Sequence, residues 1–137
     1  KIYNLYLNNL NYINNWDLVD ISAHHIIGVF LFDKNTQKLY ELANSDHLWS
    51  QRIAILSTLY FIKQGVNTHT IKLAEHFLTH KHDLIHKATG WMLREVGKRN
   101  IDELCTFLDK FHKIMPRTML RYSIEKLSKE KRNFYMS

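Results

Sequence analysis

The chain has 137 residues, the length of one domain, and its 45% hydrophobic and 23% charged residues exclude an intrinsically disordered protein. Four Gly and one Pro are too few turn residues for a β-barrel or a β-sandwich, and a single Cys excludes a disulfide framework and a multi-thiolate zinc site. Residues 1–50 carry three Lys and five acidic residues (−2) and residues 51–137 carry sixteen Lys or Arg and eight acidic residues (+8), so the net charge of +6 lies in the C-terminal part and suits either a nucleic-acid partner or a solvated basic surface.

Apolar residues recur at helical spacing along the whole chain, and no segment has the strict alternation of a half-exposed strand. Predicted helices cover, in chain order, residues 2–13, 16–32, 36–43, 46–65, 68–79, 83–99, 101–111 and 116–124. Ser45 or Asp46 can cap the helix that Gly65 ends, Asn100 can cap a later one, and Pro116 suits the first turn of the last. The sequence therefore predicts an all-α protein.

One short pattern returns in the second helix of each predicted pair: a charged residue, then an apolar or aromatic one, then a small one. It occurs at Asp20-Ile21-Ser22, Arg52-Ile53-Ala54, Lys87-Ala88-Thr89 and Arg121-Tyr122-Ser123, at intervals of 32, 35 and 34 residues. An interval of this length across two helices is typical of HEAT-like repeats. We predict that residues 1–137 form a single α-solenoid domain of paired antiparallel helices, with the four charged residues along one concave, basic groove.

The three cations of this ladder suit a phosphate backbone, but the carboxylate of Asp20 opposes a polyanion and so needs another task. Trp16 lies one turn before Asp20, and Trp91 lies one turn after Lys87, so each tryptophan offers an aromatic plane to a cationic group. The alternative is that both tryptophans are core residues and that Asp20 is an intramolecular partner of Arg52.

Four segments of the chain resemble motifs of the AlkD-like DNA alkylation-repair glycosylases. Asn15–Asp20, followed by Ser22-Ala23 and Gly28, is similar to the Trp-Asp-x-Val-Asp segment of that family. Three further segments, Trp49–Leu56, Ile85–Glu95 and Met115–Lys126, are similar to the three motifs that follow it in the family. The motifs come in the family's order with matching gaps. The family's domain carries further helical repeats before the position that matches Lys1, so the chain resembles roughly its C-terminal three-fifths.

This resemblance implies a monofunctional glycosylase that removes purines alkylated at N3 or N7 from double-stranded DNA, with no cofactor and no metal. Asp20 would be the catalytic carboxylate, and Trp16 and Trp91 would flank the lesion nucleotide. Arg52 would lie near the DNA backbone, and Arg94 matches a family arginine of unassigned role. The predicted DNA-binding residues are Arg52, Lys87 and Arg121. We expect a cytoplasmic monomer that makes no membrane contact.

One position departs from the family, which usually has Pro after Ser-Ala where this chain has His24; the change alters the backbone near the catalytic carboxylate. The alternative function is a non-catalytic HEAT-like scaffold that binds DNA or protein. Lys87 as a Schiff-base nucleophile is a further hypothesis, but no feature of the sequence around it activates its amine for that role.

The remaining candidate groups are interpreted as structural. Two histidine pairs, His76/His80 and His82/His86, have the i, i+4 spacing of helical metal ligands, but no further ligand accompanies them, so we predict surface histidines. Cys105 falls among apolar residues and is predicted to be a buried core thiol. The segment Lys129–Arg132 is interpreted as a solvated terminal run.

Overall fold

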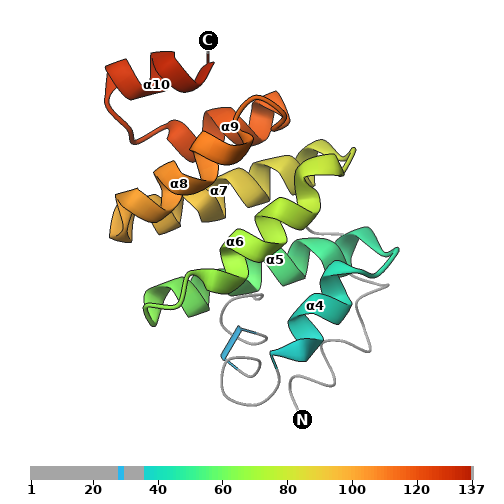
Figure 1. Cartoon of the computed structure of the whole chain (residues 1–137). Helices are drawn as coiled ribbons and strands as arrows, with labels where there is room; N and C mark the ends of the chain where they lie inside the picture. The colour runs from blue at the N-terminus through green and yellow to red at the C-terminus, as the bar shows by residue number, and fades with distance from the viewer. Residues whose placement is uncertain (1–27, 30–35, 137) are drawn as a thin grey trace. The chain divides into compact units, whose positions relative to one another are not determined.

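The computed structural model describes residues 28–29 and 36–136, and all the elements it assigns within 36–136 are helices (Figure 1). In chain order they are α4 (Gln37–Ala43), α5 (Leu48–Lys63), α6 (Thr68–His76), the 3₁₀ turn η3 (Phe77–Thr79), α7 (Asp83–Arg99), α8 (Ile101–Phe111), α9 (Arg117–Ile124) and α10 (Lys129–Met136). The all-α prediction is therefore confirmed. The helices predicted over residues 2–13 and 16–32 lie outside the described residues, apart from two positions. None of the described helices is both long and apolar enough to cross a membrane.

The chain divides into two compact units, residues 1–66 and residues 67–137, and each is described by itself. The single domain over residues 1–137 stays a prediction. In the first unit α4 packs against α5. α5 carries apolar residues around most of its circumference, and eleven of its sixteen residues are buried. A helix that is apolar on all sides needs neighbours on all sides, so α5 is a core helix.

The ends of α5 show how local sequence sets a helix boundary. Gly65 has a φ of +88°, the left-handed conformation that glycine adopts at low cost. Its N–H donates to the carbonyl of Ile62 at 2.9 Å, and the N–H of Val66 donates to the carbonyl of Phe61 at 2.9 Å. This pair of hydrogen bonds is a Schellman motif, and the predicted stop at Gly65 is confirmed. The predicted cap is wrong, because the N-cap is His47, whose N–H donates to the hydroxyl of Ser45.

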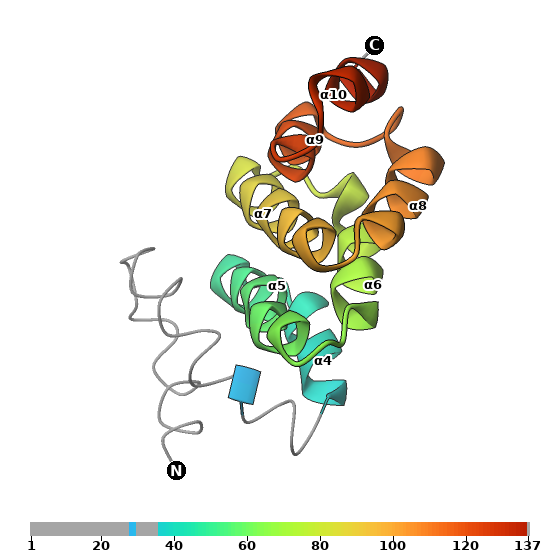
Figure 2. The ribbon, with the colours of Figure 1, turned by 90° about the vertical axis from the view of Figure 1, so that its left-hand side faces the viewer.

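In the second unit α7 is the central helix. α6, α8 and α9 pack against it, with the most extensive contact made by α9, and α10 packs on α9 (Figure 2). The side chains of Met92, Leu93 and Leu120 between these helices are fully buried. A Cβ atom placed on Gly90 would lie 2.6 Å from the carbonyl oxygen of Met119, so the lack of a side chain at Gly90 lets α7 and α9 approach closely.

Side-chain caps fix where α7 and α8 begin. The ring Nδ1 of His82 accepts a hydrogen bond from the N–H of Leu84 at the start of α7. At the start of α8, Oδ1 of Asn100 accepts from the N–H of Glu103 at 3.2 Å, and its amide nitrogen donates to the Glu103 carboxylate at 3.1 Å. The predicted cap at Asn100 is therefore confirmed, and so are the predicted bounds of both helices.

The C-terminal segment differs from its prediction. Its charged residues are exposed, as the prediction of a solvated run requires, but they also form the first turn of α10, a helix that was not predicted. The hydroxyl of Ser128 accepts a hydrogen bond from the N–H of Lys131, and Tyr135 is buried with its hydroxyl donating to Asp109 at 2.8 Å. Cys105 is half-buried, with its sulfur 3.8 Å from the ammonium of Lys131, so the predicted fully buried thiol is wrong.

Candidate nucleic-acid interface on α7 and α9

One face of α7 carries polar and aromatic side chains at positions i, i+4 and i+7, which lie on the same side of a helix. They are Lys87, whose side chain is 44% exposed, half-buried Trp91, and Arg94, whose side chain is 18% exposed. The opposite face holds residues such as Met92 and Val96, which are fully buried. Lys87, Trp91 and Arg94 therefore lie on the side of α7 opposite its fully buried residues.

α9 presents a matching row of polar residues. Thr118 and Arg121 lie on one side of the helix, and Glu125 follows them at its C-terminal end. The side chains between them, Met119 and Leu120, are fully buried. The apolar face of α9 therefore packs inward against α7 and leaves this polar row outward.

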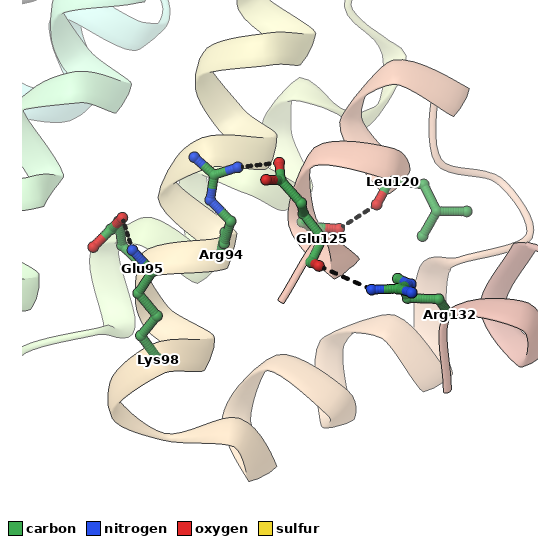
Figure 3. A network of polar contacts seen from close by, with 7 residues as sticks. Arg94, Glu95, Lys98, Leu120, Glu125 and Arg132 are labelled. Atoms are coloured by element: carbon green, nitrogen blue, oxygen red, sulfur yellow. Dashed lines mark hydrogen bonds and ion pairs between the residues drawn. The ribbon is translucent and has the colours of Figure 1, made fainter. Parts of the chain in front are cut away.

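Two polar contacts join the rows of α7 and α9 at both ends. Nη1 of Arg94 lies 2.6 Å from Oε2 of Glu125, and the two side chains point toward each other in Figure 3. At the other end, a hydrogen bond from Thr118 is the main cause that lowers the pKa of Asp83, and Lys87 adds to it. Because the start of α7 meets the start of α9, the two helices run in the same direction.

We call this surface the α7/α9 face. It consists of Asp83, Lys87, Trp91, Arg94, Thr118, Arg121 and Glu125. Its register agrees with the repeat interval, since residues 34 positions apart, Lys87 and Arg121, belong to neighbouring helices in contact.

The cations of the α7/α9 face are available to an anionic ligand. Arg121 is exposed and makes no hydrogen bond or ion pair within the part of the chain that the structure describes. Lys87 pairs with Asp83 at 3.4 Å, but both side chains are largely exposed. An exposed pair of this kind adds little to stability, so Lys87 can exchange Asp83 for a phosphate at little cost.

Arg94 is held more firmly than either of them. It is mostly buried, and its contact with Glu125 is short. Its Nε atom is buried without a hydrogen-bond partner among the described residues. Arg94 is therefore fixed in place beside Trp91, three residues away on the same helix.

A family model described as DNA alkylation repair enzyme matches residues 1–127 of the chain. The chain belongs to the DNA alkylation repair enzyme family. The resemblance that the four sequence motifs carry is thus confirmed at the level of the family. Membership supports a role in DNA alkylation repair and implies DNA as a partner. No curated protein and no solved structure matches the chain.

The site residues that the resemblance to the family predicts for this chain lie in different parts of it. Lys87, Trp91 and Arg121 lie together on the α7/α9 face. Arg52 belongs to α5 in the first unit and is 7% exposed. The catalytic candidate and its neighbours, Asp20, Trp16 and His24, lie outside the described residues, so their roles stay predictions.

Sequence reasoning missed Glu125 as the partner of Arg94. The two residues are 31 positions apart, and no local pattern links them. The repeat interval alone does not predict this pair, because an interval of 34 residues from Arg94 leads to Ser128, three positions beyond Glu125.

A groove of 420 Å³ lies between α6 and α8, away from the α7/α9 face. Its lining includes the carboxylates Glu75, Asp102 and Glu103 and the apolar side chains of Ile71 and Phe107. The lining also holds one cation, Lys110, but three carboxylates outnumber it and repel a phosphate backbone, so this groove is no candidate for DNA.

The histidines near the start of α7 form a cluster of their own. His86 contacts the backbone carbonyl of His80 through Nε2 at 2.6 Å, and the two rings lie 6.4 Å apart. Burial is the main cause that lowers the pKa of His80, and His86, His82 and His76 add to it. Nowhere in the described ranges do three His, Cys, Asp or Glu side chains gather as a metal site requires.

Proposed function

We propose that this member of the DNA alkylation repair enzyme family is a monofunctional glycosylase. It hydrolyses the N-glycosidic bond of purines alkylated at N3 or N7 in double-stranded DNA, as a cytoplasmic monomer without metal or cofactor. The α7/α9 face is the observation that supports this proposal beyond family membership. It carries Trp91 on the same side of α7 as Lys87, and Arg121 on the adjoining helix.

The chemistry needs few groups. An N3- or N7-alkylated purine is cationic and leaves the sugar as a neutral base, so no strong general acid is required. Positive charge then develops on the deoxyribose. A carboxylate about 4 Å away, such as that of Asp20, attracts this charge by about 4 kcal/mol at an effective dielectric constant near 20. Only the increase of that attraction in the transition state accelerates the reaction, and Asp20 can also orient the attacking water.

Trp91 offers the lesion an aromatic face. A cation over a tryptophan ring gains about 0.5–2 kcal/mol, and more when the ring is shielded from water. Trp91 is half-buried, so part of its ring is already shielded by protein. In this proposal Trp16 supplies a second ring. Recognition then rests on the positive charge of the alkylated base, and neutral damaged bases are poor substrates.

In this proposal cationic side chains bind the DNA backbone beside the alkylated base. Lys87 and Arg121 bind phosphates from the α7/α9 face, Lys87 as a point charge and Arg121 with its planar fork of donors. Arg52, which is predicted to serve the same purpose, is buried in α5 and has less of its side chain to offer.

The proposal is tested by release of free base from duplex DNA that contains a single N7-methylguanine. The Asp20→Asn variant should lower the rate of release by roughly 100-fold or more, because it removes a charge that acts at the transition state. Asp46→Asn is the matched control, since Asp46 is an exposed carboxylate before α5, and its release rate should equal that of the wild type.

Three outcomes contradict the proposal in different ways. If wild type and Asp20→Asn release base equally, Asp20 is not the catalytic carboxylate. If neither releases base but both bind DNA with a steep salt dependence, the chain is a DNA-binding scaffold and not an enzyme. Efficient excision of a neutral damaged base would contradict recognition by charge.

A further inference from the structure

A second pocket lies beside the α7/α9 face, between α9 and α10. It has a volume of 390 Å³ and is lined by Arg121, Ile124, Glu125, Arg132, Asn133 and Met136. We propose that this pocket binds a phosphate group of the DNA backbone through Arg121, Arg132 and Asn133. The family match ends at residue 127, before α10, so the pocket joins a family helix to a segment beyond the match.

The hydrogen-bond donors of the pocket have few acceptors among the described residues. Arg121 is exposed and has no partner within the described ranges. Arg132 donates from Nη1 to the carbonyls of Glu125 and Leu127, both at 3.3 Å, and no contact is made by its Nη2 or Nε within residues 36–136. Asn133 is exposed, and its side-chain amide likewise has no partner there. Two guanidinium groups and an amide around one pocket match the acceptors of a phosphate.

The hydrogen bonds of Arg132 also fix its position. Its Nη1 binds the carbonyl of Glu125, the C-cap of α9, where a helix leaves acceptors unsatisfied (Figure 3). The same atom also binds the carbonyl of Leu127 in the turn that follows. The guanidinium is therefore already ordered before any ligand arrives. A pre-ordered donor loses less entropy on binding than a free surface side chain does.

Glu125 is the group in the pocket that opposes an anion. Its carboxylate turns toward Arg94 and pairs with it at 2.6 Å, which compensates much of its charge (Figure 3). Counting Arg94 and Glu125 as a neutral pair, the pocket keeps the charges of Arg121 and Arg132. The pocket is therefore a cationic site despite its carboxylate.

This inference rests on the proposed function for its partner, DNA, but not for the glycosylase chemistry. If it is correct, Arg132 and Asn133 of α10 add donors to the phosphate contact that Arg121 makes at the edge of the α7/α9 face. Backbone contacts of this kind position the protein on the duplex and carry no sequence information. They should therefore strengthen binding to damaged and undamaged DNA alike.

The test is the binding of wild type and variants to an undamaged duplex over a range of salt concentrations. Arg132→Gln should weaken binding by roughly tenfold at low salt and reduce the salt slope by about 0.9, the amount expected for one phosphate contact, whereas Arg121 is already assigned to the α7/α9 face. Asn133→Ala should weaken binding a fewfold and leave the slope unchanged, because it removes no charge. Lys126→Gln, the same charge change at an exposed residue outside the pocket, should leave both quantities close to wild type.

The outcomes separate this inference from the glycosylase proposal. Equal effects of Arg132→Gln and Lys126→Gln would overturn the inference, because the pocket would then act only as general surface charge. NMR titration with inorganic phosphate that perturbs the Arg121 and Arg132 side chains, without any change of DNA-binding slope in Arg132→Gln, would also overturn it in favour of a free-anion site. Loss of base release with the predicted slope change intact would overturn the glycosylase and support the pocket.

Discussion

α5 and α7 carry the same repeat pattern but bury it differently. Arg52 in α5 is 7% exposed, whereas the side chain of Lys87, its counterpart in α7, is 44% exposed. Eleven of sixteen residues are buried in α5, against seven of seventeen in α7. Equivalent positions in a repeat are therefore not equivalent in chemistry. The surrounding residues decide whether the charged side chain at such a position is buried or exposed.

The largest effect expected from this contrast is on stability. Arg52→Ala should lower the free energy of unfolding by roughly 2–3 kcal/mol, because it removes a buried side chain together with its packing. Lys87→Ala should change it by less than about 0.5 kcal/mol, as expected for an exposed residue. Urea unfolding followed by circular dichroism measures both. Equal effects of the two substitutions would show that the contrast in burial carries no energetic weight.

The second prediction concerns Gly90, where α7 and α9 approach each other closely. A Cβ at Gly90 would meet the carbonyl oxygen of Met119 and the Cβ of Tyr122, each at 2.6 Å. Gly90→Ala should therefore lower the free energy of unfolding by about 1–3 kcal/mol, although alanine favours a helix more than glycine does. Lys98→Ala, at an exposed position of the same helix, is the control. A gain of stability in Gly90→Ala would mean that α9 can shift without cost.

A smaller effect is expected at the histidine cluster before α7. The pKa of His80 lies below its ordinary value of 6.5, mainly because of burial and then because of the neighbouring histidines. The unfolded chain then binds more protons than the folded one, so the stabilisation is present above pH 6.5 and is lost as pH falls through the folded pKa. Wild type should lose stability between pH 7 and pH 5, and His80→Gln should lose less. Parallel pH profiles of the two proteins would contradict this.

In the second unit, the sequence predicted the bounds of the helices better than the contacts between their surface side chains. The bounds of α7 and α8 follow from clear signals, an apolar stripe at helical spacing and the cap at Asn100. The helix α10 was not predicted because its first turn is charged and has no apolar residue. The buried residue that holds it in place, Tyr135, comes only seven residues after Ser128, whose hydroxyl accepts a hydrogen bond from the first turn. Spacing could place Lys87, Trp91 and Arg121 on second helices. It could not predict that Glu125 pairs with Arg94, because that contact depends on how far α9 is shifted along α7.

The central claim, that the α7/α9 face holds an alkylated base against Trp91, is tested most directly by single-turnover release of N7-methylguanine from duplex DNA by Trp91→Ala. Loss of a cation–π contact of about 0.5–2 kcal/mol predicts a release rate lower by roughly 2- to 30-fold. Binding of undamaged duplex should stay close to wild type, since an undamaged base carries no positive charge. An unchanged release rate in Trp91→Ala, or an equal loss of binding to undamaged DNA, would contradict the claim.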